Sequence, residues 1–245
     1  MKHTTKIKML DVEAVRLGVT VVVHPVLFQD DDGVTLVDTI YPGQFDRLQR
    51  AMEKVGVNPK QVRRIVLTHQ DIDHIGAMRE LIELCGENLT IYAHAVEKPY
   101  IEGTRPHAKL TPERIAARLQ ALPEENRLAA AAMFAAIPTF RVHCAIQDGD
   151  VLPFHGGIRV IHTPGHTPGH VCLFLTEQRT LIPGDELRVE KGRLVGPSQE
   201  NTLNVPEALR SMKKLLGLNI EHVYAFHGGY HAGDISAVIS ELAGQ

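Results

Sequence analysis

The chain has 245 residues, and its 26 Lys and Arg against 29 Asp and Glu give a formal net charge of -3. A nucleic-acid partner is not expected, because binding a phosphate backbone requires concentrated positive charge. The three cysteines, Cys85, Cys144 and Cys172, are widely spaced and form no Cys-x-x-Cys pair. This spacing argues against a disulfide framework and against a thiolate zinc site.

The N-terminal residues contain only a few apolar positions before Asp11 and Glu13, and no stretch reaches the roughly 20 apolar residues that a membrane span needs. We therefore expect a cytoplasmic protein with no secretory signal and no membrane partner. A chain of this length can bury one substantial core, so a single domain over residues 1–245 is predicted.

The predicted elements form two strand-rich halves, each with helices. In the first half, apolar and β-branched runs predict strands at 6–10, 18–26, 34–38, 64–68 and 90–92, and helical periodicity predicts helices at 45–55 and 75–85. The segment 97–140 then interrupts this order with helical patterns at 114–122 and 125–136, separated by Pro123. The second half predicts strands at 151–154, 158–162, 171–175, 180–182 and 222–225, and helices at 206–216, with Asn204 as its cap, and 234–242.

The most informative segment is Thr68-His69-Gln70-Asp71-Ile72-Asp73-His74, which directly follows the apolar run Ile65-Val66-Leu67. Imidazole and carboxylate side chains suit zinc, iron or manganese, and two of each exceed what one four-coordinate ion normally takes from one loop. The segment therefore indicates a two-metal centre. In an alternative interpretation it is a helix start, with Asp73 capping a helix that begins at His74.

Three later predicted strands are also followed by imidazole or carboxylate side chains. The loop from Thr163 to His170 follows a predicted strand and contains His166 and His170, held between prolines and glycines. Asp185 follows the strand at 180–182, and His227 follows the strand at 222–225. Spacing alone does not decide between His166 and His170, and His231 is a weaker alternative to His227.

In their order and contexts, these residues resemble the metallo-β-lactamase superfamily of metal-dependent hydrolases. The family pattern is His-x-His-x-Asp-His, then a histidine in a Gly-His context, a bridging Asp after a strand, and a final His near the C-terminus. The resemblance extends from Asp38 to His227, and the segment from Thr163 to His170 is especially similar to glyoxalase-type thioesterases and acyl-homoserine-lactone lactonases. It implies an α+β fold, an αββα sandwich of two packed mixed sheets with helices on both outer faces. One position departs from the pattern, because Asp71 stands where the family has its second histidine.

Carried over position by position, the resemblance implies two divalent metal ions per chain. Their implied ligands are His69, Asp71 and His166 for one ion and Asp73, His74 and His227 for the other, with Asp185 bridging the two. It also implies that Asp38 orients a ligand, whereas turn preference alone would explain Asp38 equally well. His170 is expected to contact the ligand residues without binding a metal itself. Zinc is the favoured metal, and the hard carboxylate of Asp71 shifts the balance toward iron or manganese.

The expected activity is hydrolysis of a small ester, thioester or lactone by water that the metals activate, with Asp73 also passing a proton to the leaving atom. No Gly-x-Ser-x-Gly motif is present, so a serine nucleophile is not expected. The alternatives are a lactonase specific for acyl-homoserine lactones and a non-catalytic metal-containing binding or sensor module. A flavin-dependent di-iron oxidoreductase would need a further flavin domain, and a mono-iron dioxygenase would need only three protein ligands. A small-molecule substrate is expected as the partner, and a homodimer is left open.

The helical segment at 97–140 has two interpretations. In enzymes that the chain resembles, this region covers the substrate, and on that basis Tyr100, His107, Met133 and Phe134 are candidate contacts of a substrate lid. The alternative is a plain helical hairpin that packs on the sandwich.

Overall fold

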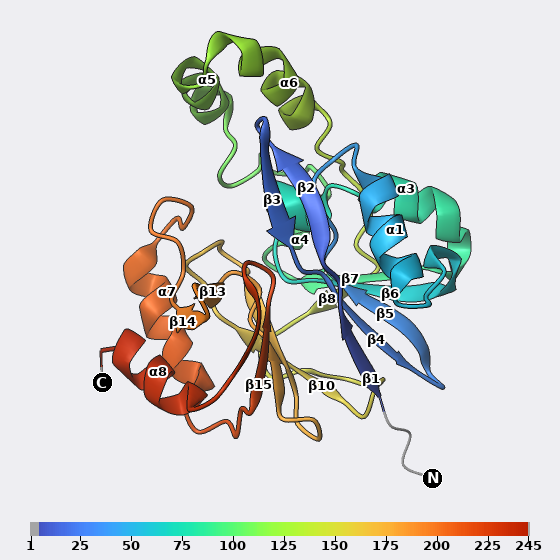
Figure 1. Cartoon of the computed structure of the whole chain (residues 1–245), viewed down its shortest axis with the longest axis vertical. Helices are drawn as coiled ribbons and strands as arrows, with labels where there is room; N and C mark the ends of the chain where they lie inside the picture. Colours follow the sequence, from blue (N-terminus) through green and yellow to red (C-terminus); the bar gives the residue numbers. More distant parts are fainter. Residues whose placement is uncertain (1–4, 245) are drawn as a thin grey trace.

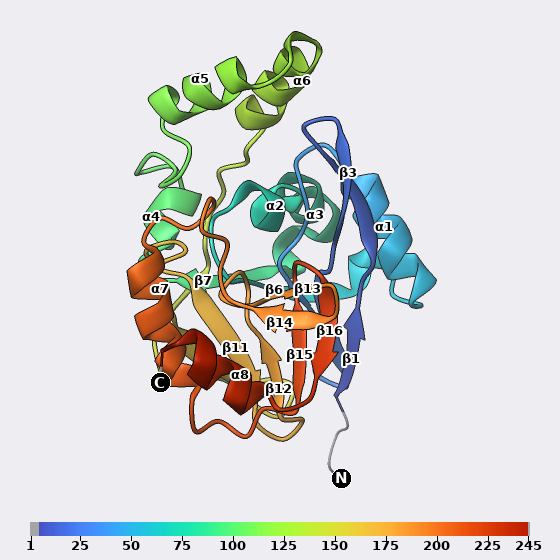
Figure 2. The same cartoon turned by 60° about the vertical axis from the view of Figure 1, so that its left-hand side comes forward.

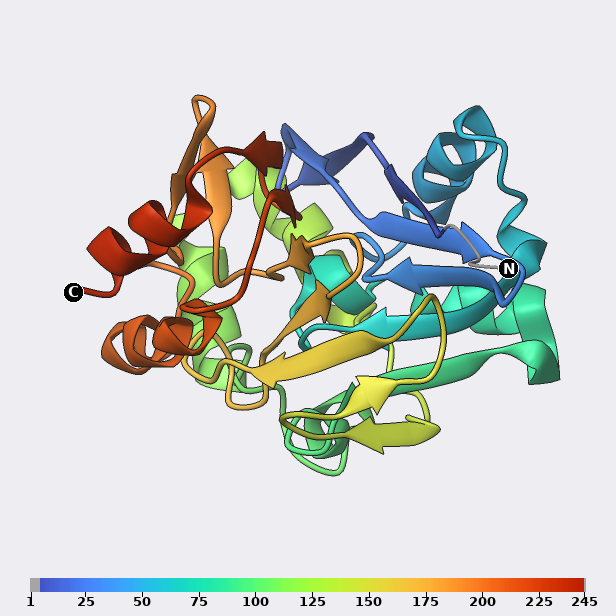
Figure 3. The ribbon, with the colours of Figure 1, turned by 90° about the horizontal axis from the view of Figure 1, so that it is seen from below.

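Two mixed sheets lie face to face and have helices on their outer sides, in a computed structural model that describes residues 5–244 (Figures 1 and 3). The first six-stranded sheet has the order β1 (Lys6–Met9), β4 (Val26–Asp30), β5 (Gly33–Val37), β6 (Val62–Leu67), β7 (Thr90–His94) and β8 (Cys144–Ile146). The second has the order β16 (Gly229–Ala232), β15 (His222–Ala225), β12 (Thr180–Ile182), β11 (Val171–Leu175), β10 (Ile158–His162) and β9 (Val151–Leu152). The predicted αββα sandwich is therefore confirmed.

The helices divide between the two outer faces. Those of the first half are α1 (Phe45–Lys54), α2 (Ile72–Ile75), α3 (Met78–Cys85) and α4 (Lys98–Ile101). Those of the second half are α7 (Val205–Met212) and α8 (Ile235–Leu242), and two ribbons complete the body: β2 (Val12–Arg16) with β3 (Val19–Val23), and β13 (Arg188–Glu190) with β14 (Arg193–Val195). None of the helices described between residues 5 and 244 is long and apolar enough to span a membrane.

Strand β11 shows why the chain forms a sandwich. All five of its residues are buried, because alternate side chains point to opposite faces of a strand and both faces are covered. Val171, Leu173 and Leu175 join the core between the two sheets. Cys172 and Phe174 instead join the core beneath α7 and α8.

Several predicted boundaries were wrong for local reasons. The strand expected at 18–26 is shorter, because Leu17 (φ 51°) and Gly18 (φ 81°) form a tight turn between β2 and β3. It ends at Val23, and β4 begins only after Pro25. The expected helix at 75–85 is interrupted at Gly76, where a Cβ would lie 2.3 Å from the backbone nitrogen of Pro42. Strands β2, β8, β13, β14 and β16 were not predicted.

The helix-start interpretation of Asp73 is also wrong. Helix α2 begins at Ile72, so Asp73 lies inside its first turn, and the residue before the helix, Asp71, makes no side-chain capping bond. By contrast, the predicted cap of α7 is confirmed: the side-chain oxygen of Asn204 accepts a hydrogen bond from the Glu207 backbone nitrogen at 3.1 Å.

The helices of the 97–140 segment form a hairpin that extends beyond the sandwich (Figures 1 and 2). Helix α5 covers Pro112–Ala121 and helix α6 covers Glu124–Ala135, close to the predicted bounds. No residue of α5 is buried, and only Ala130 and Phe134 of α6 are. Their small apolar cluster reaches the body at Leu17 and Ile72.

Candidate metal centre

The four predicted strand ends meet at one edge of the sandwich. Strand β6 ends at Leu67 and leads into the loop with His69 and Asp71. Pairing through β11 makes β10 run in the same direction as β12, and β12 pairs in parallel with β15. The carboxyl ends of these three strands therefore share an edge and present His166, Asp185 and His227.

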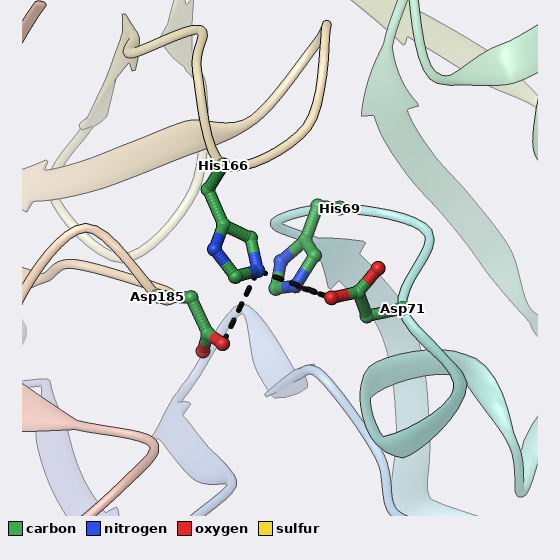
Figure 4. A group of neighbouring side chains, drawn as sticks. All are labelled: His69, Asp71, His166 and Asp185. Atoms are coloured by element: carbon green, nitrogen blue, oxygen red, sulfur yellow. Dashed lines mark hydrogen bonds and ion pairs between the residues drawn. The ribbon is translucent and has the colours of Figure 1, made fainter. Parts of the chain in front are cut away.

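The seven predicted ligands form two groups. The ligand atoms of His69, Asp71, His166 and Asp185 all lie within 4.8 Å of one another, and Figure 4 shows these four side chains converging from three separate segments. The second group, defined by the same distance, consists of Asp73, His74 and His227.

Asp185 lies between the two groups. Its Oδ2 atom is 3.3 Å from Nε2 of His166 and 3.4 Å from Nε2 of His227, and its Oδ1 atom is 3.2 Å from Nε2 of His74. One carboxylate therefore contacts both groups, which is the arrangement expected of a bridging ligand.

Buried donor atoms without partners support a cation at this place. Within the described residues, Nε2 of His69, Nε2 of His74, Oδ1 of Asp71 and Oδ1 of Asp185 are buried and have no hydrogen-bond partner. Burying such atoms unpaired costs about 1–3 kcal/mol each. Four of them directed into one small volume fit divalent cations, which accept lone pairs from imidazole and carboxylate.

Asp38 fixes the orientation of His74. Its Oδ1 atom accepts a hydrogen bond from the Thr68 backbone nitrogen at 2.8 Å, and its Oδ2 atom lies 2.9 Å from Nδ1 of His74. Because a carboxylate only accepts, Nδ1 of His74 carries a proton, and Nε2 is the ring nitrogen that faces the centre. Asp38 adopts a left-handed backbone conformation (φ 59°), which an aspartate tolerates at some cost.

The Thr68 hydroxyl does the same for His69. It donates to Oδ2 of Asp38 at 2.7 Å and lies 2.9 Å from Nδ1 of His69, so it accepts the imidazole proton and leaves Nε2 as the lone-pair atom. Burial, followed by the nearby His74, lowers the pKa of His69 to about 4, so this imidazole is neutral near pH 7.

His170 uses both ring nitrogens within the protein. Its Nε2 atom accepts a hydrogen bond from the Asp185 backbone nitrogen at 3.0 Å, and its Nδ1 atom lies 2.8 Å from the Thr163 hydroxyl. This leaves it no lone pair for a metal, whereas Nε2 of His166 lies within the first group. The geometry thus places His166, and not His170, in the first group, and His170 contacts the backbone of Asp185. His231 lies in β16, opposite Val223, and belongs to neither group.

The second group is strongly charged. Burial alone would raise the pKa of Asp73, but His74 and His227 lower it to about 2. Burial alone would lower the pKa of His227, but Asp185 and Asp73 raise it to about 9. Tyr41 donates its hydroxyl to Oδ2 of Asp73 at 3.3 Å. The ionised carboxylates can therefore hold cationic partners at neutral pH.

Comparison with known proteins agrees with this geometry. A model of the metallo-beta-lactamase superfamily matches residues 19–227, most of the chain. The chain belongs to this superfamily. Within it, the protein YflN of Bacillus subtilis (strain 168), named a probable metallo-hydrolase, is 32% identical over 182 residues. That match covers 69% of this chain and 65% of YflN, just under two thirds of the relative.

Two solved structures are similar over nearly the whole chain. The metallo-beta-lactamase family protein TTHA1429 from Thermus thermophilus has a TM-score of 0.70 at 27% identity, covering 97% of this chain and 78% of that one. TTHA1623, whose structure is a di-iron-bound form, has a TM-score of 0.61 at 26% identity, covering 91% and 93%.

Two residues that the sequence did not single out lie against the candidate ligands or their loops. Lys109 is 5% exposed, and its Nζ atom lies 2.5 Å from Oδ2 of Asp71 and 2.7 Å from Nε2 of His166. Glu97 is fully buried, and its carboxylate accepts hydrogen bonds from the loops on both sides. The sequence signal for Lys109 was indirect: Asp71 places a carboxylate where the superfamily has a neutral histidine, and a carboxylate favours a nearby cation.

Glu97 joins the first two ligand loops. Its Oε2 atom accepts from the backbone and side-chain nitrogens of Gln70 at 3.0 and 2.8 Å. Its Oε1 atom accepts from the Thr167 hydroxyl at 2.8 Å and the Gly169 backbone nitrogen at 2.6 Å. Residues next to His69 and His166 are thereby held to one carboxylate.

A cavity of about 250 Å³ opens over the centre. His107, Met133 and Phe134 line it, as predicted for the helical segment, whereas Tyr100 lies on α4 and is not among the lining residues. The lining combines ligands with apolar and cationic side chains: Arg16, Leu17, Tyr41, Asp71, Ile72, Asp73, His107, Lys109, Leu110, Arg118, Met133, Phe134, Asp185, Arg188, Ser198, Asn201 and His227.

Proposed function

We propose that this chain is a metal-dependent hydrolase that opens a small ester, thioester or lactone at a centre of two divalent cations. The observation that supports this most strongly is the pair of ligand groups sharing Asp185 at the floor of a cavity, with unpaired donor atoms turned inward. Cations held there would lower the pKa of a water molecule and polarise a substrate carbonyl.

The protein's own residues supply the remaining steps. Asp38 and Thr68 hold His74 and His69 in the tautomers that present Nε2. Asp73 lines the cavity, and the charges around it keep its carboxylate ionised. It can accept a proton from the attacking water and return it to the leaving atom, and the hydroxyl of Tyr41 donates a hydrogen bond to the same carboxylate.

The cavity lining supports a small substrate with an apolar part and an anionic group. Leu110, Met133 and Phe134 offer apolar contacts from the helical segment, which we propose to act as a lid over the substrate. Arg16 and Arg118 line the same cavity from different segments, and neither guanidinium has a carboxylate partner among residues 5–244. Unpaired guanidinium groups favour binding of carboxylate or phosphate.

The test is turnover by protein stripped with a chelator and then reloaded with zinc, manganese or iron(II). We expect metal-dependent hydrolysis within a panel of acyl-homoserine and other lactones, thioesters and activated esters, with phosphodiesters as the contrasting class. Turnover that survives complete metal removal would contradict the proposal. Full metal loading without turnover of any carbonyl substrate would favour the binding or sensor module instead.

A further inference from the structure

The side chain of Lys109 lies where one of the two cations would bind. Its Nζ atom is in hydrogen-bonding distance of both Oδ2 of Asp71 and Nε2 of His166, which are two of the atoms that converge in Figure 4. An ammonium group donates and never accepts, so this contact uses the lone pair of Nε2 of His166. The same atom also lies 3.1 Å from Oδ2 of Asp71. A metal would need that lone pair and that carboxylate oxygen, so it and the ammonium group compete for one position.

The second ligand group has no such competitor. Among the described residues, no lysine or arginine forms an ion pair or hydrogen bond with Asp73, His74 or His227. The two groups therefore differ in one respect. Only the group of His69, Asp71 and His166 has a lysine ammonium within hydrogen-bonding distance of its ligand atoms.

The backbone of Lys109 is fixed to the ligand loop. His107 Nε2 lies 2.8 Å from the carbonyl oxygen of Gln70, and the Ala108 backbone nitrogen donates to Oε1 of Gln70 at 2.8 Å. Gln70 is held in turn by Glu97. The amine can thus leave the ligands by rotation of its flexible side chain into the cavity, which Lys109 itself lines, while the backbone stays in place.

We infer that Lys109 is a built-in cation that competes with metal for the group of His69, Asp71 and His166, so that the two metal positions fill in sequence. The group of Asp73, His74 and His227 fills first. The group beside Lys109 fills only when the amine has moved into the cavity. This inference rests on the ligand groups of the proposed function and adds the order in which they are occupied.

The test is calorimetric titration of metal-free protein with Zn²⁺, with bound metal counted by elemental analysis. We expect wild type to bind one Zn²⁺ tightly and a second at least about tenfold more weakly, the size of effect that groups contacting metal ligands commonly have. Lys109→Met keeps the length and apolar stem but removes the amine, and should tighten the second step by about tenfold or more while leaving the first unchanged.

Arg118→Met is the matched control. It removes a positive charge from the same cavity without touching any ligand atom, so it should leave the ratio of the two affinities as in wild type. Two equal sites in wild type would overturn the inference. So would an unchanged ratio in folded Lys109→Met, or a shift in Arg118→Met as large as in Lys109→Met, which would indicate a general field effect.

A second measurement needs no variant. Lysine acetylation of wild type, mapped by mass spectrometry, should find Lys109 protected in the metal-free protein and with one equivalent of Zn²⁺, and labelled once the second equivalent binds. Protection that persists with two Zn²⁺ bound would overturn the inference. Absence of any Zn²⁺ binding would instead contradict the proposed metal centre itself, so the two failures are distinguishable.

Discussion

The ligand loops and the α5–α6 hairpin both line one cavity and differ in how tightly they are held. His69, His74 and His166 are completely buried, and the ring nitrogens of His69 and His74 that face away from the centre are fixed by Thr68 and Asp38. In the hairpin, α5 buries no residue at all. The difference indicates that the loops fix the chemistry, whereas the hairpin has room to change with the substrate.

Close contacts at two glycines hold the ligand loops in one conformation. A Cβ at Gly165 would lie 2.2 Å from the backbone nitrogen of Ala208, and one at Gly184 would lie 2.5 Å from Nε2 of His170. Both glycines have positive φ, so each is needed for its backbone conformation and for the close approach. The hairpin is held less closely, and its Leu128 is 84% exposed.

The largest effect is expected from Asp185→Ala, because this carboxylate contacts both ligand groups. The variant should lose both metals and its activity should fall by about a thousandfold or more, as removal of an essential electrostatic group does. It should also lose the metal-dependent rise in thermal stability, worth about 2.7 kcal/mol when free metal is about 100 times Kd. Elemental analysis and calorimetry check this. Retention of two metals would remove Asp185 from the ligand set.

Within the ligand loops, replacements of His166 and His170 should have different effects. His166→Ala removes a donor atom of the first group, so metal content should fall and turnover should be lost. His170→Ala removes the acceptor for the Asp185 backbone nitrogen, so metal should stay bound with affinity reduced about 10- to 100-fold. Metal content and kcat, measured for both variants, distinguish the two roles. The reverse ranking would contradict the positions given to these two histidines.

Asp71 is the ligand-loop residue that departs from the superfamily pattern. Asp71→His should keep two metals and raise the share of zinc over iron or manganese under matched growth conditions, because imidazole is the softer ligand. It also leaves Lys109 without its carboxylate, so the double variant Asp71→His with Lys109→Met should be the more stable of the two. If metal content and identity are unchanged in both Asp71→His and Asp71→Ala, Asp71 does not reach the metal.

The smallest effect is expected from the hairpin. Met133→Ala and Phe134→Ala should raise KM or change acyl-chain preference while metal content stays at the wild-type level, because both residues line the cavity and belong to neither ligand group. Leu128→Ala, at an exposed position of the same helix, is the matched control and should change neither. An equal loss for every substrate, together with a lower Tm, would make the hairpin a packing element and not a lid.

The sequence predicted the sandwich and the two ligand groups because both depend on local patterns. Alternating apolar strands specify the layers, and each predicted ligand directly follows a strand or lies in a loop with proline and glycine. Lys109 and Glu97 follow no such pattern. Their contacts with Asp71 and Gln70 span 38 and 27 residues, and only the folded chain brings them to the centre.

The errors in the predicted elements have one local and one distant origin. Gly18 was assigned to a strand because valines follow it, but its positive φ belongs to the turn that separates β2 from β3. Gly76 was assigned to a helix interior, and the backbone of Pro42, much earlier in the chain, lies so close there that a Cβ would be 2.3 Å from its nitrogen. That close approach cannot be read from the neighbouring residues.

The central claim is that seven side chains hold two metals and that one of the seven, Asp185, contacts both. An anomalous difference map from crystals saturated with Zn²⁺, recorded on both sides of the zinc absorption edge, tests it most directly. The account predicts two peaks, one bounded by His69, Asp71 and His166 and the other by Asp73, His74 and His227, with Asp185 between them. No peak at this edge of the sandwich, or peaks coordinated by other residues, would contradict it.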